Sequence, residues 1–416
     1  MTAAAEAHAL VPKLRFPEFL ESWSFVTISK FFDFTEKVEK TTTFDKDKVL
    51  TVKLHAGGIV KNEKATLTGK ANYFNRKVGQ FIFSKIDLLN GAFGVIPEPL
   101  DGFASSSDVP AYSFNAEHSS MFFVNWLKAK YEHLEIERTG TSSTLKRVSP
   151  EKFLALAIPV PTLNEQQKIA DCLASIDELI TLESQKLDTL KRHKKGLMQQ
   201  LFPAEGETVP RLRFPEFRDA GEWNVKNLKN VCEVNPSNAV LPEKFVYIDL
   251  EAVEAGKLKL RKIIYQEEAP SRAQRLLRYG DVIFQMVRPY QRNNLHFKIN
   301  EEIPYVASTG YAQLRANESE DFLFQAVHTD GFVEQVIAKC TGSSYPAINS
   351  SDLAELPLAI PQKAEQQKIA DCLTSLDDRI AAQNQKIDAL KTHKKGLMQQ
   401  LFPAPDGFSA AQAGNT

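Results

Sequence analysis

The feature that most constrains this chain of 416 residues is a long internal repeat. Residues 165–204 read EQQKIADCLASIDELITLESQKLDTLKRHKKGLMQQLFPA, and residues 365–404 read EQQKIADCLTSLDDRIAAQNQKIDALKTHKKGLMQQLFPA, which gives 29 identities in 40 positions. The offset of 200 residues far exceeds the period of roughly 20–50 residues that marks a solenoid. A second motif, LRFPEF, occurs at 14–19 and at 212–217 and keeps nearly this offset. The chain is therefore a tandem duplication of whole domains.

The two repeated segments have the pattern of long coiled-coil helices. Apolar residues recur alternately every three and four positions, with Glu183 and Lys194 as polar positions of the first seam. A period of 3.5 over more than four heptads is typical of a helix that packs on another helix. Thr162 followed by Glu165 predicts a capping box, and a proline ends each segment. The apolar seam is Ile169, Leu173, Ile176, Ile180, Leu187, Leu190, Leu197 and Leu201, with counterparts 200 residues later.

A helix of about 38 residues is roughly 57 Å long, because each residue adds about 1.5 Å. Two such helices in one chain can bury each other's apolar stripe. We expect them to lie antiparallel about a pseudo-twofold axis, with one divergent domain at each end, so that they act as a spacer. The competing interpretation is that the helices only provide internal packing for the two domains.

The regions between the repeats read as α+β domains. Short apolar runs at 81–83, 157–160, 245–248 and 282–284 predict strands, and residues 121–131 and 322–338 have helical spacing. The predicted fold class is α+β, with two α+β domains separated by two long antiparallel coiled-coil helices in a pseudo-twofold tandem duplication. The predicted parts are a tail (1–12), the first domain (13–161), the central helix (162–204), the second domain (205–361), the C-terminal helix (362–404) and a tail (405–416).

No pattern typical of catalysis occurs in the sequence. Phosphate-binding loops, the cofactor-binding glycine motifs and zinc-ligand spacings are missing, and the four cysteines lie far apart. We therefore expect no catalytic residue, no metal site and no cofactor in this chain. No apolar run of about 18 residues and no signal-peptide pattern is present, so we expect a cytoplasmic protein with no membrane partner.

The chain has almost no net charge, but one region is basic enough to bind nucleic acid. The chain has 51 basic and 52 acidic side chains, but residues 257–298 contain ten basic residues against three acidic ones. A local excess of this kind attracts phosphate. A polar stretch there directly follows the predicted strand 282–284 and is rich in side chains that read base edges, although a plain polar surface loop is the competing interpretation. Its candidate DNA-binding residues are Gln285, Arg288, Tyr290, Gln291, Arg292, Asn293 and Asn294.

Further candidates for DNA binding lie in both halves. Polar residues follow the matching strand of the first half, and each half has a Thr-Gly turn rich in serine. Backbone N–H groups and hydroxyls of such turns suit phosphate contacts. In the first half the candidates are Ser84, Lys85, Asn90, Arg138, Thr139, Lys146 and Arg147, and in the second half they are Ser343, Ser344, Tyr345 and Asn349.

Taken together, these motifs resemble the specificity subunit of type I restriction-modification systems. The resemblance rests on LRFPEF with a following tryptophan, the Gly-Asp-Val-Ile-Phe strand at Gly280, the Thr-Gly turns, and Pro-x-x-x-Glu-Gln-Gln-Lys-Ile-Ala at the start of each long helix. It covers the chain from Leu14 to Pro403. It implies a non-catalytic subunit whose two target-recognition domains each read one half of an asymmetric, split sequence in double-stranded DNA.

The resemblance also implies partners. Two methyltransferase subunits would dock on the helices and methylate adenine at N6, and ATP-driven restriction subunits would join them. S-adenosylmethionine, ATP and Mg²⁺ would belong to these partners.

Identical sequence in the two helices indicates that the same partner binds twice. We expect exposed partner-binding faces there, with a merely solvated face as the alternative. The rival functions are a structural coiled-coil adaptor with protein-binding globular domains, and a nuclease with an unrecognised metal site. The expected partner contacts are Glu165, Gln166, Lys168, Glu365, Gln366 and Lys368.

Overall fold

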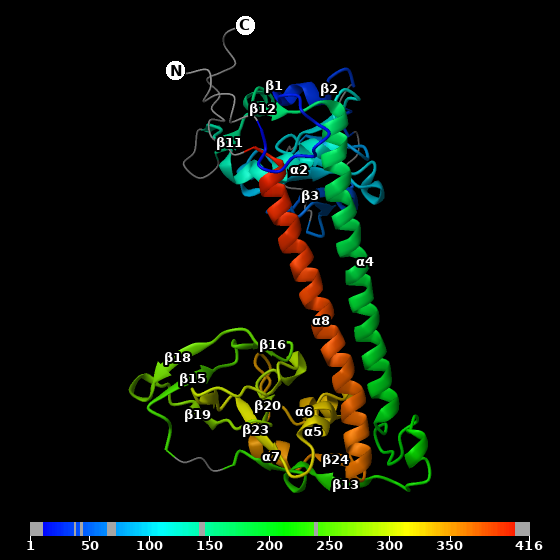
Figure 1. Cartoon of the computed structure of the whole chain (residues 1–416), viewed down its shortest axis with the longest axis vertical. Helices are drawn as coiled ribbons and strands as arrows, with labels where there is room; N and C mark the ends of the chain where they lie inside the picture. The colour runs from blue at the N-terminus through cyan, green and yellow to red at the C-terminus, as the bar shows by residue number, and fades with distance from the viewer. Residues whose placement is uncertain are drawn as a thin grey trace. The chain divides into compact units, whose positions relative to one another are not determined.

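The computed structural model describes residues 11–36, 39–41, 45–64, 72–140, 146–236 and 240–403 (Figure 1). The predicted C-terminal tail and most of the predicted N-terminal tail lie outside these residues. The chain divides into two compact units, residues 1–183 with 386–416, and residues 184–385. The boundary falls inside both long helices, so each unit holds the first part of one helix and the last part of the other.

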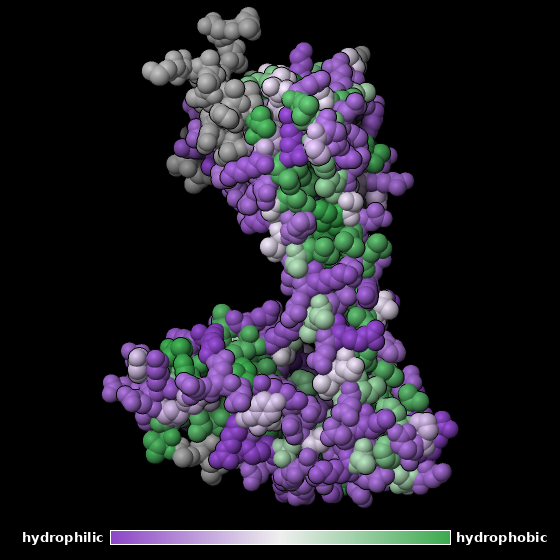
Figure 2. All heavy atoms as spheres, in the orientation of Figure 1, coloured by the Kyte–Doolittle hydropathy of each residue, from purple (hydrophilic) through white to green (hydrophobic). Residues whose placement is uncertain are grey.

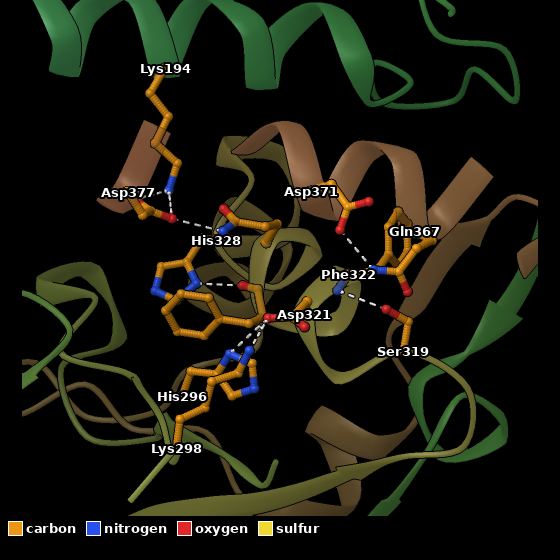
Figure 3. A network of polar contacts seen from close by, with 12 residues as sticks. Lys194, His296, Lys298, Ser319, Asp321, Phe322, His328, Gln367, Asp371 and Asp377 are labelled. Carbon is orange, nitrogen blue, oxygen red and sulfur yellow. Dashed lines mark hydrogen bonds and ion pairs between the residues drawn. The ribbon is translucent and has the colours of Figure 1, made fainter. Parts of the chain in front are cut away.

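The two predicted long helices are present as α4 (Leu163–Leu201) and α8 (Lys363–Leu401), each of 39 residues. Within each unit, the segments of α4 and α8 run in opposite directions and are joined by ion pairs at the predicted polar seam positions. In the first unit Lys394 Nζ donates to both carboxylate oxygens of Asp177, at 2.5 and 2.6 Å, and Lys386 pairs with Glu183. In the second unit Lys194 Nζ lies 2.7 Å from Asp377 (Figure 3).

The outer ends of the seam pack into the domains rather than only on the other helix. Ile169 and Leu173 at the start of α4 are buried in the core of the first unit, together with Trp23, Phe122 and Leu401. The second unit repeats this arrangement with the matching residues of α8. The competing interpretation, in which the helices serve the domains internally, therefore holds at the helix ends.

The first unit is built on a four-stranded antiparallel sheet of order β2-β9-β6-β7. The side chains of Phe81 and Phe83 are fully buried against α2 in an aromatic core. Two small antiparallel pairs, β3-β4 and β5-β8, are linked by a parallel bridge from Val49 to Ala104. The bounds are β2 (Phe32–Asp33), β3 (Leu50–Val52), β4 (Ile59–Lys61), β5 (Tyr73–Asn75), β6 (Phe81–Phe83), β7 (Phe93–Val95), β8 (Ala104–Ser106), β9 (Ala111–Phe114), α2 (Ser120–Lys130), β10 (Arg138–Thr139), β11 (Arg147–Val148) and α3 (Pro150–Leu154).

The second unit has two four-stranded sheets, of order β14-β23-β20-β21 and β18-β15-β22-β19. In Figure 1, α5 and α6 lie beside α8, and β15, β18 and β19 lie beyond β20 and β23. Phe245 and Tyr247 of β15 face one apolar cluster while Val246 and Ile248 face another, so this strand is buried on both sides. The bounds are β14 (Cys232–Val234), β15 (Lys244–Ile248), β16 (Val253–Glu254), β17 (Lys257–Leu258), β18 (Lys262–Tyr265), β19 (Ala273–Leu276), β20 (Val282–Gln285), β21 (Leu295–His296), β22 (Tyr305–Ser308), β23 (Tyr311–Ala316), α5 (Glu320–Ala326), α6 (Asp330–Ala338) and α7 (Ser350–Ala354).

The two units share one topology despite their divergent sequences. The order β2-β9-β6-β7 matches β14-β23-β20-β21, and the parallel bridge at Val49 stands where β15 and β22 pair in parallel. All four predicted strands are confirmed, as is the helix predicted at 121–131. The single helix predicted at 322–338 is wrong, because the hydroxyl of Thr329 caps a new helix by accepting from Phe332 N–H.

Each domain is closed by a strand pair next to a long helix. β1 (Ser24–Thr27) pairs with β12 (Ala157–Val160), and β13 (Asn224–Asn227) pairs with β24 (Pro357–Ile360). The registers are identical after the 200-residue shift, since Ser24 faces Val160 and Asn224 faces Ile360. The two strand pairs, which we call the frame, have therefore kept the same pairing residue by residue since the duplication.

The visible face of each unit is mainly hydrophilic, with hydrophobic side chains in small groups (Figure 2). Among the described residues, no helix combines the length and the apolar character needed to span a bilayer.

Candidate nucleic-acid interface

A buried ion pair joins the LRFPEF motif of the first unit to the start of α4. Arg15 donates from Nε and from one terminal nitrogen to the two oxygens of Glu165, both at 2.8 Å. The Trp23 indole N–H donates to the same carboxylate at 3.3 Å. Glu165 is only 1% exposed, and its hydrogen bond raises the pKa of Arg15. Among the described residues, the Glu165 carboxylate accepts from Arg15 and Trp23 and not from Thr162, so the predicted capping box is not formed.

The second unit repeats the ion pair without the tryptophan hydrogen bond, and we call these contacts the clamp. Arg213 donates to both oxygens of Glu365 at 2.7 Å. In the first unit the Leu14 N–H also donates to the carbonyl of Gln400 near the end of α8, and the second unit has the matching bond near the end of α4. LRFPEF therefore joins the start of one long helix to the end of the other. The clamp comprises Arg15, Trp23, Glu165 and Gln166 in the first unit and Arg213, Glu365 and Gln366 in the second.

The predicted exposure of the glutamate and glutamine pairs is wrong. Gln166 is 1% exposed, and its amide accepts from Ser119 N–H at 2.9 Å and donates to the Pro161 carbonyl at 2.9 Å. Gln366 is buried in the same way and donates to Glu318 and to the Pro361 carbonyl. These residues hold each domain on its helix. Of the six predicted partner contacts, only Lys168 and Lys368 lie on the surface, beside Glu18 and Glu216.

In the second unit, the predicted DNA-binding stretch forms the loop between β20 and β21. Its backbone passes through a 3-10 turn (Pro289–Gln291) flanked by Arg288 and Arg292, both with positive φ. Such a conformation is uncommon for residues with a side chain and needs support from its surroundings. We call residues 286–294 the reading loop.

Four of the predicted residues provide this support. Asn294 is 1% exposed and accepts from Gln285 N–H at 2.7 Å, while the Gln285 carbonyl oxygen of the side chain accepts from Asn293 N–H at 3.0 Å. Arg292 donates to Asp330 at 2.7 Å and to the His328 carbonyl at 3.1 Å. This hydrogen bond from Arg292 is the main cause of the lowered pKa of Asp330. Gln285, Asn294 and Arg292 are therefore engaged in contacts inside the protein.

Arg288 and its neighbours have the opposite character. The Arg288 guanidinium lies 4.3 Å from the centre of the Tyr345 ring and forms no hydrogen bond or ion pair with any residue in the described ranges. Tyr290 and Tyr345 are 52% and 63% exposed. Ser343 and Ser344 are also exposed, and Asn349 caps α7 by accepting from Asp352 N–H. Loop and turn are joined, because Arg288 N–H donates to the Pro346 carbonyl at 2.7 Å.

The first unit brings part of its predicted set together. Arg147 donates to both oxygens of Asp108, at 2.9 and 3.0 Å, which lowers the pKa of Asp108. Lys85 lies beside this pair, since its carbonyl accepts from Val148 N–H and its own N–H donates to the Asp108 carbonyl. The remaining predicted residues are distributed over the surface: Asn90, Arg138, Thr139 and Lys146 are exposed and Ser84 is partly buried, and the stretch 141–145 between them lies outside the described residues.

The described residues contain no group of histidine, cysteine and acidic side chains suited to a metal ion. Among them, all four cysteines are free, and burial raises the pKa of Cys232 to about 12.

Comparison with known proteins decides the family. The sequence profile of the type I restriction modification DNA specificity domain matches residues 21–192 and again residues 220–392. The chain belongs to the type I restriction-modification specificity subunits. It is 23% identical over 316 residues to the type I restriction enzyme MjaVIII specificity subunit of Methanocaldococcus jannaschii, covering 72% of this chain and 73% of that protein. It is 28% identical over 178 residues to the HindI specificity subunit of Haemophilus influenzae, covering 42% and 36%.

Solved structures share the fold of this specificity subunit. The S subunit of a type I restriction-modification system from M. genitalium superposes with a TM-score of 0.56 at 16% identity, covering 95% of this chain and 99% of that one. A chain from a structure of type I R-M complex assembly and conformational transition gives a TM-score of 0.54 at 16% identity, covering 93% and 99%. The predicted family and the two-domain α+β organisation are confirmed.

Sequence reasoning missed the residues that support the reading loop of this specificity subunit. His328 donates from Nδ1 to the Phe324 carbonyl at 2.6 Å, and its other ring nitrogen faces the Asn294 amide at 3.2 Å. Burial lowers the pKa of His328 to about 4, so the ring stays neutral in this role. Asp330 and Gln199 line a groove of about 1080 Å³ between the end of α4 and α6. A histidine and an aspartate in a predicted helix carried no signal of this role.

We expect the clamp to stabilise the first unit of this specificity subunit far more than its surface ion pairs do. Glu165→Ala leaves Arg15 without its carboxylate in a buried site, which costs about 3–5 kcal/mol when one partner of a buried pair is removed. The measurement is the free energy of unfolding of the full chain in urea. The matched control is Lys168→Ala, whose partner Glu18 is half-exposed at 3.6 Å, with an expected loss below about 1 kcal/mol. Equal losses for the two variants would contradict a stabilising role for the clamp.

Proposed function

We propose that this specificity subunit is the non-catalytic DNA-recognition and scaffold subunit of a type I restriction-modification complex that methylates adenine at N6. One observation carries the proposal: the specificity-domain profile matches the chain twice. The two matched domains differ in sequence, but the strand pairs that close them have identical register. Two domains of different sequence that are held in the same way suit the recognition of two different half-sites in double-stranded DNA. The recognised sequence is then bipartite and asymmetric.

Because the two long helices have nearly the same sequence, the chain can bind two copies of one partner. Exposed residues that recur in both helices and take no part in the clamp are the best candidates for that contact. Gln167 donates to Asp171 at 2.8 Å on the surface of α4, and Gln367 donates to Asp371 in the same way on α8. With Lys168 and Lys368, these residues form two matching polar surfaces for two methyltransferase subunits. Restriction subunits join this assembly, and S-adenosylmethionine, ATP and Mg²⁺ are bound by the partners in the cytoplasm.

The direct test is the methylome of a methylation-free host that expresses the chain with its methyltransferase subunits. We expect N6-methyladenine at one bipartite motif with two different half-sites. The affinity of the assembled complex for that DNA should fall steeply with salt, because phosphate contacts release counterions. A complex that leaves the host adenines unmodified and binds DNA without salt dependence would instead support a protein-binding adaptor.

We further propose that the continuous helices α4 and α8 set the gap between the half-sites. Removing residues 180–186 and 380–386 deletes one heptad from each helix and keeps the 3.5-residue period of the seam. Seven residues account for about 10 Å of helix, or roughly three base pairs of DNA at about 3.4 Å each. In the same methylome assay, we expect both half-sites to be retained with a gap about three base pairs shorter. A gap of unchanged length would contradict the spacer.

A further inference from the structure

The reading loop separates its arginines into two chemical roles. Arg292 is held by Asp330 and by the His328 carbonyl, and both of these partners belong to the same unit. The Arg288 guanidinium lies over the Tyr345 ring and has no hydrogen-bond acceptor among the described residues. An arginine with a carboxylate partner has to break an ion pair before it can bind DNA. Arg288 has no such pair to break.

Tyr345 restrains the place where Arg288 presents its donors. A guanidinium 4.3 Å from a ring centre is attracted by the negative face of the ring, and stacking leaves the N–H groups at the edge free. The backbone on both sides is also fixed. Arg288 N–H donates to the Pro346 carbonyl, and Ile348 N–H donates to the Met286 carbonyl at 3.1 Å, so the loop and the turn that carries Tyr345 form a short two-stranded ladder.

The positive φ of Arg288 gives its side chain a direction that an extended residue there would not have. The loop tolerates this conformation because Gln285, Asn293 and Asn294 bond its base from within. A residue of positive φ that its surroundings support in this way is typical of a functional position. Pre-arranged donors also lose little conformational entropy when they bind.

We propose that Arg288, oriented by Tyr345, is the specificity-determining residue that reads a guanine in the second half-site. This inference rests on the proposed function. A planar guanidinium with two free parallel N–H groups matches the O6 and N7 acceptors of guanine in the major groove, and the other bases lack that acceptor pair. Arg292 is a positioning residue of the loop. Tyr345 is a positioning residue as well, because it acts through Arg288.

The test uses the assembled methyltransferase complex. With Arg288→Ala, the methylome should lose the preference for guanine at one position of one half-site, and the other half-site should stay unchanged. Tyr345→Phe keeps the ring face and should keep the guanine, whereas Tyr345→Ala should relax the same position as Arg288→Ala does. A motif that stays complete in Arg288→Ala would overturn the inference. Failure of the proposed function looks different, because the unmodified complex itself would then produce no bipartite motif.

A second measurement avoids the question of whether a variant folds. The unmodified complex is titrated with duplexes in which 7-deazaguanine replaces each guanine of the half-site in turn, which removes only the N7 acceptor. We expect affinity to fall about 2- to 12-fold at one position, because one of the two hydrogen bonds is lost and loss of the whole arginine–guanine pair gives about 5- to 140-fold. Arg288→Ala should bind the ordinary and the substituted duplex alike, because it has no donor for N7. Equal affinity of the unmodified complex for every substituted duplex would overturn the inference.

Discussion

The buried ion pair between LRFPEF and the start of a long helix is the interaction on which each unit depends. Arg15 and Glu165 are 150 residues apart in sequence, and everything between them is the first recognition domain. Closing so long a loop is entropically costly, and a buried, bidentate pair is geometrically demanding. The pair therefore fixes the domain on its helix in one orientation. Arg213 and Glu365 do the same in the second unit.

The clamp and the strand pairs beside it hold each domain on its helices. The residues between the paired strands have therefore been free to change. The first unit joins Gln80 of the loop before β6 to Ser113 by a neutral hydrogen bond of 3.1 Å. At the matching place, the second unit has a buried Asp281 in a bidentate pair with Arg315 at 2.9 Å. The strand order around both pairs is the same. The two units therefore carry different chemistry at matching positions of one topology.

The periodic parts of the molecule could be predicted from the sequence. The 3.5-residue seam gave both long helices, and short apolar runs such as 245–248 gave buried strands, because hydrophobic spacing determines local structure directly. Burial of Glu165 could not be predicted from local pattern, since its partner lies in another motif. The recurrence of one arginine and one glutamate in two separately repeated motifs was the available signal for that pair.

The reading loop shows the same limit. Gln285, Asn294 and Arg288 look alike in composition, but their roles depend on His328, Asp330 and Tyr345, which come from distant parts of the chain. Sequence could therefore place the loop without distinguishing its supporting residues from Arg288, whose guanidinium has no hydrogen-bond acceptor among the described residues.

The central claim is that both domains are held in the same way and that the residues between their closing strands can be exchanged. The most direct test is to exchange one such segment for the other. Residues 28–156 replace residues 228–356, a segment of equal length, between β-strand pairs of identical register. The methylome of a host that carries the graft with the methyltransferase subunits is then sequenced. The account predicts a symmetric motif in which the first half-site occurs twice as an inverted repeat. Methylation that retains the original second half-site would contradict it.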